Sequence, residues 1–216
     1  MSNDSKLKQA VLDELSWEPS VTAAHIGVAA HDGVITLSGH VATYAEKHAA
    51  EAAATRVKGV RAVAEEIEVQ LPSQTTRTDE EIGAAAVQRM MWDSSIPANA
   101  VHVKVEKGWV TLSGEVKWFF QKEAAAHDVR SLWGVLGVSD QVTVRPHVDT
   151  SRIKEAITEA LGRTWLFDPN TVTVHADGGK VRLGGTARSM AEERIAIVTA
   201  WAAPGVMAVE NDIRIG

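Results

Sequence analysis

The chain of 216 residues contains no cysteine, which excludes disulfide bonds, thiolate nucleophiles and zinc sites built on thiolates. It has no apolar run near the roughly 20 residues that span a bilayer, so no transmembrane segment is predicted. It also lacks an excess of basic residues, because its net charge is −6. Proteins that bind nucleic acid present a basic surface to the phosphates, so nucleic acid is not an expected partner.

The first residues also lack the apolar segment of a signal peptide, because residues 1–7 run directly into an amphipathic pattern. We therefore expect a cytoplasmic protein, with a periplasmic location as the alternative if a leader peptide has been removed. The negative net charge weakens electrostatic attraction to anionic lipid without excluding it.

What the chain does have is internal repetition, marked by three glycine triplets with the same spacing of 6 and then 20 residues. The triplets start 75 and 71 residues apart, and they are Gly33, Gly39 and Gly59; Gly108, Gly114 and Gly134; and Gly179, Gly185 and Gly205. Two spacings kept three times indicate a triplicated domain. We expect domains at residues 1–72, 78–146 and 149–216. Units this small are marginally stable alone, so packing between them or oligomerisation would stabilise them.

Each copy opens with a predicted amphipathic helix, whose apolar residues recur every four positions, as in Leu7, Val11 and Leu15. The expected N-caps of these helices are Ser5, Asp79 and Thr150. A tryptophan closes each helix, and large aromatic side chains usually dominate core burial. We therefore expect these rings to plug the open end of each small core; they are Trp17, Trp92 and Trp165.

Two short strands follow, joined by a tight turn. Asp32-Gly33 is typical of a type I′ hairpin turn, and the same place holds Lys107-Gly108 and Gly178-Gly179. Alternation predicts that Ile35 and Leu37 face inward. The second strand is expected to end at a glycine in each copy: Gly39, Gly114 and Gly185.

A second helix and a last strand complete each copy. Thr43 and Glu46 match a capping box, as do Ser189 and Glu192, whereas Trp118 takes the cap position in the second copy. The expected C-cap glycines are Gly59, Gly134 and Gly205. The predicted fold class is therefore α+β: three tandem αββαβ domains, each a three-stranded mixed sheet with two helices on one face.

This order of elements, with a glycine at the end of strand two and Gly-Val before the last strand, resembles the bacterial BON domain. The landmarks are Gly39 and Gly59 with their equivalents in the other two copies, and the resemblance covers nearly the whole chain. It implies a non-catalytic module of envelope and osmotic-stress proteins. It also implies binding of phospholipid in some members, of potassium in a cytosolic type, and chaperone-like action in others.

The residues themselves give no support for an enzyme. The eight histidines occupy no common position in the three copies, and none forms the spaced helical pair of a zinc protease. Ser38 and Ser113 lack the preceding glycine of a nucleophile elbow, and Gly184 replaces them in the third copy. We expect no catalytic residue, no metal and no cofactor.

Two features are candidate contact surfaces. Trp118 and Phe120 align with small or polar residues in the other copies, so we expect them either to dip into a membrane interface or to pack between domains. Phe119, which aligns with Tyr44 and Met190, is expected to be core. The open sheet face of the second copy would present Trp109, and a sheet face or edge can pair with another chain.

Three hypotheses of function remain. The leading one is a non-enzymatic bacterial stress-related binding protein whose modules bind a protein partner or a phospholipid surface. The alternatives are a potassium or small-ion sensor, in which backbone carbonyls would hold the ion, and a chaperone-like holdase with exposed apolar surface. An oligomer is compatible with all three.

Overall fold

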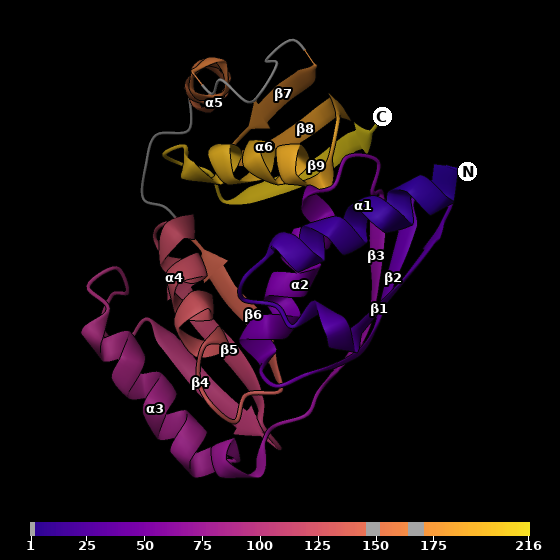
Figure 1. Ribbon diagram of the computed structural model, residues 1–216. Coiled ribbons are helices and arrows are strands. Elements are labelled where there is room, and N and C mark those ends of the chain that lie inside the picture. The colour runs from indigo at the N-terminus through magenta and orange to yellow at the C-terminus, as the bar shows by residue number, and fades with distance from the viewer. Residues whose placement is uncertain (1–2, 146–151, 164–170) are drawn as a thin grey trace.

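The structure is a computed structural model that describes residues 3–145, 152–163 and 171–216. Within these residues the chain folds as three units of the same kind, which follow one another along the sequence (Figure 1). The first unit has the elements α1 (Asn3–Trp17), η1 (Ala23–His25), β1 (Ile26–His31), β2 (Val34–Val41), α2 (Tyr44–Arg56) and β3 (Ala62–Val69).

The second and third units repeat this order. The short connecting helix η2 (Ser73–Thr75) leads into α3 (Asp79–Trp92), β4 (Val101–Glu106), β5 (Trp109–Val116), α4 (Phe119–Arg130) and β6 (Gly137–Val144). The third unit comprises α5 (Ile153–Gly162), β7 (Val172–Asp177), β8 (Lys180–Ala187), α6 (Met190–Ala202) and β9 (Ala208–Ile215).

Each unit contains one three-stranded mixed sheet with the second strand in the middle. In the first sheet β1 pairs antiparallel with β2, and β2 pairs parallel with β3, with Leu37 opposite both Val28 and Glu65. The other two sheets have the same pairing and register. The predicted fold class of three tandem α+β domains is confirmed. No helix in the described ranges is both long enough and apolar enough to cross a membrane.

The cores form where the sequence pattern predicts them. Ile35 and Leu37 of β2 are fully buried, as are their equivalents in β5 and β8. The stripe of the first helix is buried at Val11 and Leu15. The equivalent positions of the other two copies are all buried: Ile82, Ala86 and Met90 in α3, and Ile153, Ile157 and Leu161 in α5. Each domain therefore has its own hydrophobic cluster between its sheet and its two helices.

The predicted helix caps need correction at several places. α1 begins at Asn3, so Ser5 lies inside the helix, and Thr150 lies outside the described residues. Thr78, rather than Asp79, caps α3 through a reciprocal capping box with Glu81. Asp79 instead accepts hydrogen bonds from the backbone N–H groups of Lys107 and Gly108, at 2.7 and 2.8 Å. Its carboxylate thus braces the β4–β5 turn.

Of the two hydrogen bonds in each predicted capping box of α2 and α6, the structure confirms the one from the backbone N–H to the hydroxyl of the cap. The Thr43 and Ser189 hydroxyls accept the backbone N–H of Glu46 and Glu192, as expected. Both carboxylates reach past the cap to the residue before it, accepting the N–H groups of Ala42 and Arg188. Hydrogen bonds here are more numerous than in a simple box, because buried Glu46 also accepts the N–H of Thr22 at 2.7 Å.

The glycines have the predicted left-handed backbone, but two of their roles differ. Asp32-Gly33 and its equivalents have positive φ at both residues, which confirms the type I′ turns. The β2 strand continues two residues beyond Gly39, so this glycine does not end the strand. Gly59 lies three residues beyond the last residue of α2, so it is a turn glycine with φ +92° rather than a C-cap. The same corrections apply to the equivalents of both glycines, Gly114, Gly185, Gly134 and Gly205.

The prediction that tryptophans plug the cores is wrong for the two that can be described. Trp17 is 85% exposed and Trp92 is 84% exposed. Each is the last residue of its helix, and the apolar stripe that precedes it has already filled the core. Trp165 lies outside the described residues.

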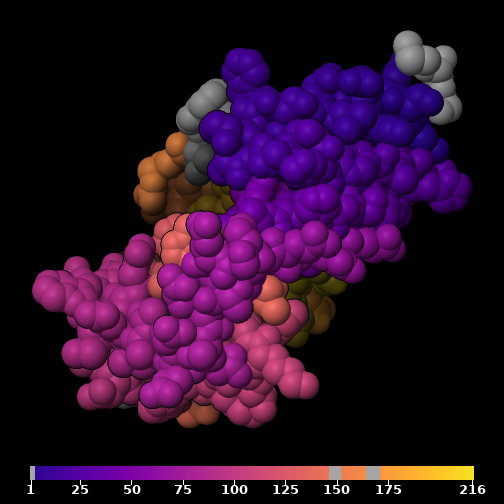
Figure 2. All heavy atoms as spheres, turned by 60° about the horizontal axis from the view of Figure 1, so that its bottom comes forward, coloured from indigo at the N-terminus to yellow at the C-terminus, as the bar shows by residue number. Residues whose placement is uncertain are grey.

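The three domains pack as a ring, with α2, α4 and α6 toward the middle (Figure 1). The ring is built from one repeated position, the first residue of the second helix. Tyr44 of α2 packs against the core of the second domain, Phe119 of α4 stacks on Trp201 of the third, and Met190 of α6 packs against the core of the first. In Figure 2 the first domain, in indigo, lies next to the second, in magenta. The first residue of each second helix therefore takes part in one domain junction.

Candidate functional site

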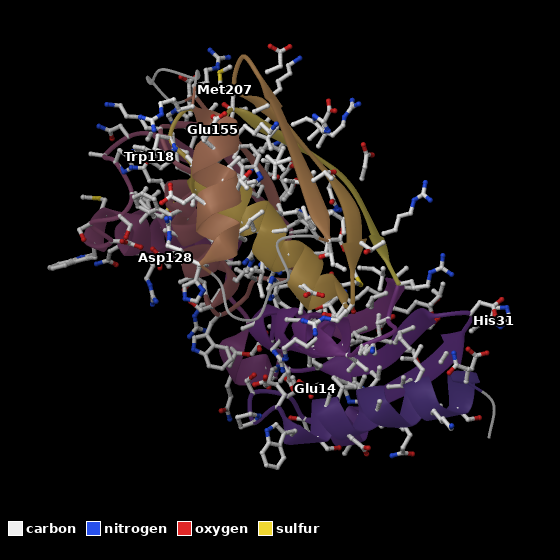
Figure 3. All side chains as sticks on the ribbon, turned by 90° about the horizontal axis from the view of Figure 1, so that it is seen from above. Glu14, His31, Trp118, Asp128, Glu155 and Met207 are labelled. Atoms are coloured by element: carbon white, nitrogen blue, oxygen red, sulfur yellow. The ribbon has the colours of Figure 1, made fainter. Side chains whose placement is uncertain are left out.

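A groove opens on the surface where α4 of the second domain meets α6 of the third. Its volume is about 550 Å³, and its lining is almost entirely carbon. We call it the interdomain groove; its lining residues are Trp118, Phe119, Phe120, Glu123, Val198, Trp201 and Ala202. Figure 3 shows Trp118 on the side of the molecule opposite to His31.

The groove brings together two of the predicted contact residues. Trp118 is half-buried, whereas Phe120 is 56% exposed. Between them, Phe119 is half-buried rather than fully core, with its ring stacked on Trp201 at a centroid distance of 5.0 Å and an interplanar angle of 13°. The three consecutive aromatic residues therefore face the third domain, which is the interdomain alternative of the sequence analysis.

Trp109, the third predicted contact residue, does not belong to this groove. It pairs with Gly137 of the neighbouring strand, and its ring lies over that glycine so closely that a Cβ there would collide with it. Trp109 is still 52% exposed. It therefore covers the open sheet face of the second domain as a separate apolar patch.

The residues on the far wall of the groove were not predicted from the sequence. They are Val198, Trp201 and Ala202, all on α6. An alignment of the three copies could have singled out Trp201, because the equivalent residues in the other two copies are Arg130 and Thr55. A lone tryptophan at that position marks a difference between domains rather than a shared scaffold residue.

A charged cluster lies where the three second helices approach one another. His48, Glu123 and Arg194 occupy the same position in the three copies, and the Arg194 guanidinium lies 3.8 Å from the Glu123 carboxylate. Burial lowers the pKa of His48, and the positive charges of Arg130 and Arg194 lower it further, against the opposing effect of Glu51 and Glu123. The imidazole is therefore kept neutral at the domain junction.

This lowered pKa predicts a pH dependence of stability. Because the unfolded chain protonates His48 near pH 6.5 while the folded chain resists protonation, stability is lost as pH falls below about 6.5. When the pH is lowered from 7.5 to 5.5, about a unit either side of the pKa in the unfolded chain, we expect the melting temperature of His48→Gln to fall less than that of the wild type. Thermal unfolding by circular dichroism measures this. Equal losses in both proteins would contradict it.

Comparison with known proteins identifies the family to which these three units belong. The family model of the BON domain matches the chain three times, at residues 3–70, 78–146 and 149–216. The chain belongs to the BON domain family. The matches follow the three αββαβ units of the fold, and the predicted resemblance is confirmed.

Among curated proteins, the chain is 30% identical over 145 residues to osmotically-inducible protein Y of Escherichia coli (strain K12), covering 63% of this chain and 72% of that protein. Two solved structures of CdsD, a structural protein of the type III secretion system of Chlamydia trachomatis, are also similar. One is 16% identical with a TM-score of 0.26, covering 96% of this chain and 91% of that chain. The other, the C-terminal domain, is 15% identical with a TM-score of 0.27 and covers both chains fully.

A possible metal cluster lies at the turn of the first BON domain, where Asp4, His31 and Asp32 bring ligand atoms within 4.8 Å of one another. His31 and Asp32 are exposed, and Figure 3 shows His31 at the far edge of the molecule. Asp4 accepts the backbone N–H of Asp32, as Asp79 does for the matching turn of the second domain. The repeated carboxylate therefore has a structural role in bracing a turn.

A second apolar surface lies at the end of α3 in the second BON domain. Met91 is 81% exposed beside Trp92, and Val87 lies one turn earlier on the helix, also exposed. Next to them a shallow groove of about 360 Å³ is lined by Val87, Met91 and the segment Ile96–Asn99. We call Val87, Met91 and Trp92 the α3 patch. Large exposed apolar side chains gathered on one surface are typical of an interaction site.

Proposed function

We propose that this chain is a non-enzymatic, bacterial stress-related binding protein that docks on phospholipid surfaces. Membership of the BON domain family and similarity to an osmotically-inducible protein support the stress-related role. The observation that carries the docking proposal is the exposed tryptophan at the end of the first helix, Trp17 in the first domain and Trp92 in the second. Side chains at a repeated position are candidates for a function that the domains share.

Tryptophan suits the boundary between lipid headgroups and acyl chains, because its ring is apolar while its N–H can still form a hydrogen bond. In the α3 patch, Met91 and Val87 extend the apolar surface that could enter this boundary. Burying Trp92 and Met91 would contribute on the order of 4 kcal/mol. That free energy corresponds to a dissociation constant of about 1 mM, so a single patch binds weakly. A second site at Trp17 would strengthen binding through avidity.

The net charge of the chain indicates which lipids it would bind. The chain has a net charge of −6, so anionic lipid does not attract it over long range. We therefore expect apolar insertion to dominate, with similar binding to zwitterionic and mildly anionic vesicles and little dependence on salt.

Liposome flotation tests the proposal. We expect the wild type to float with phosphatidylcholine vesicles, and Met91→Ala/Trp92→Ala to float about fivefold less, because the main apolar contact is removed. Trp109→Ala is the matched control, since it removes an exposed tryptophan from the same domain outside the α3 patch. The proposal fails if the wild type stays at the bottom of the gradient, or if the double variant floats as well as the control.

A further inference from the structure

Two histidines meet on the open face of the sheet in the first domain. His25 is the last residue before β1 and His40 lies near the end of β2, and their rings stack with centroids 4.8 Å apart and an interplanar angle of 16°. Because Ile26 pairs with Gly39 in the antiparallel register, the next residues outward, His25 and His40, face each other. Both side chains are exposed. The fold therefore holds two imidazoles side by side at the surface.

The histidine pair is specific to the first domain. The equivalent residues are Ala100 and Glu115 in the second domain, and Thr171 and Thr186 in the third. The same strand pairing forms in all three copies, so the fold does not require histidine at either position. The pair is not visible in the sequence, because its members lie apart in the chain and only the pairing of β1 with β2 brings them together.

The third strand of the same sheet adds carboxylates beside the pair. In the parallel register Glu68 lies opposite His40, with Glu66 two residues earlier on the same face, and both glutamates are exposed. No lysine or arginine occurs in β1, β2 or β3. In the other two sheets, by contrast, β4 contains Lys104 and β8 contains Arg182. The sheet face around the histidine pair is therefore negative, which favours a cation.

The side chains of this cluster are free to turn toward an ion. Those of His25, His40 and Glu68 form no hydrogen bond or salt bridge with another residue in the described part of the chain. Two nitrogens bound to one ion at about 2.0–2.1 Å lie no more than about 4 Å apart. Since the ring centroids start 4.8 Å apart, rotation about the side-chain bonds is enough to bring one nitrogen of each ring to a shared ion. Binding would thus displace only the stack of the two rings.

Imidazole nitrogens combined with a carboxylate oxygen suit divalent transition metals such as zinc and nickel, whereas magnesium and calcium prefer oxygen ligands alone. We propose that His25 and His40 bind one divalent transition-metal ion, with the Glu68 carboxylate as the third ligand and water completing the coordination. The site lies on the sheet β1-β2-β3 of the first domain (Figure 1). It is independent of lipid docking, because it uses neither Trp17 nor the α3 patch.

Isothermal titration of zinc chloride into the full chain, prepared without a polyhistidine tag, tests the proposal. We expect one zinc ion per wild-type chain, with a dissociation constant on the order of 10 µM, because three exposed ligands bind less tightly than the four of a closed site. Magnesium chloride should give no heat of binding. Magnesium binding as tight as that of zinc would overturn the proposal, because it would place the ion on carboxylates alone.

Three variants take their new residues from other copies: His25→Ala from Ala100, His40→Thr from Thr186, and Glu68→Thr from Thr143. Each should bind zinc at least about tenfold more weakly, because even an outer-shell partner of a metal ligand contributes about that much. Exposed substitutions change stability little, so all three should melt like the wild type without zinc. Zinc should then raise the melting temperature of the wild type more than that of any variant.

The matched control is His31→Ala, which removes an exposed histidine of the same domain from the cluster of Asp4, His31 and Asp32. We expect this variant to bind zinc as the wild type does. Loss of binding here, with unchanged binding in the variants of His25 and His40, would place the ion at the turn and overturn the proposal. Absence of zinc binding by the wild type would also overturn it. Flotation of all these variants should equal that of the wild type, so the lipid and metal proposals fail separately.

Discussion

Replacing Gly114 by alanine is expected to lower the free energy of unfolding of the second domain by about 3 kcal/mol or more. The residue has φ +131°, a conformation that L-amino acids with a side chain rarely adopt. A Cβ at this position would also lie 2.1 Å from the carbonyl oxygen of Ala100. That contact is with the backbone of the residue just before the neighbouring strand β4, so no side-chain movement can relieve it. Urea denaturation followed by circular dichroism measures the loss.

The matched control is Gly83→Ala in the same domain. Gly83 lies inside α3, where an added Cβ would meet the Val105 side chain at 3.7 Å, an ordinary contact. Alanine is the better helix former, so we expect this variant to gain about 0.5–1 kcal/mol. The same added methyl group thus has opposite effects at the two sites. A Gly114→Ala variant as stable as the wild type would contradict the close approach of the strands.

Phe119→Ala is expected to have the second-largest effect, a loss of about 2–3 kcal/mol together with a loss of coupling between the second and third domains. The ring stacks on Trp201 and also packs against the core of its own domain, so its removal weakens both. We expect differential scanning calorimetry to resolve the single transition of the wild type into a broader or double one.

The neighbouring residue supplies the control for this prediction. Phe120→Ala removes the same atoms from a side chain that is mostly exposed, so we expect a change within about 0.5 kcal/mol and an unchanged transition shape. If Phe119→Ala and Phe120→Ala melted alike, the stack on Trp201 would have no role in holding the domains together.

The sequence predicted what is local and repeated. Turn glycines such as Gly33, and inward residues such as Ile35, have short-range causes: a positive φ that needs glycine, and a strand period of two. Three copies made each of these patterns visible despite its weakness in one copy alone. The order of elements, the mixed sheets and the family therefore followed from residues alone.

The errors arose where the outcome depends on contacts between segments distant in sequence. An aromatic residue after an apolar stripe is compatible with a filled core or with an exposed ring, and only the volume already occupied by Val11, Leu15 and the sheet decides for Trp17. Trp118 was identified as unusual, but the residues on the opposite wall of its groove, among them Trp201, come from another domain. The meeting of His48, Glu123 and Arg194 depends likewise on how three domains pack, which periodicity within one domain does not report.

The side chains exchanged between domains have a consequence for assembly. Tyr44 of the first domain packs against the core of the second, and Met190 of the third packs against the core of the first, while at the remaining junction Phe119 and Trp201 stack on each other. A head-to-tail contact of this kind closes on itself when the rotation is right and otherwise grows into a filament. Removing the third domain would leave Phe119 without its stacking partner and would uncover the surface of the first domain that Met190 covers. A chain of two domains would have these apolar surfaces open to water, and we expect it to associate with a second copy more readily than the chain of three.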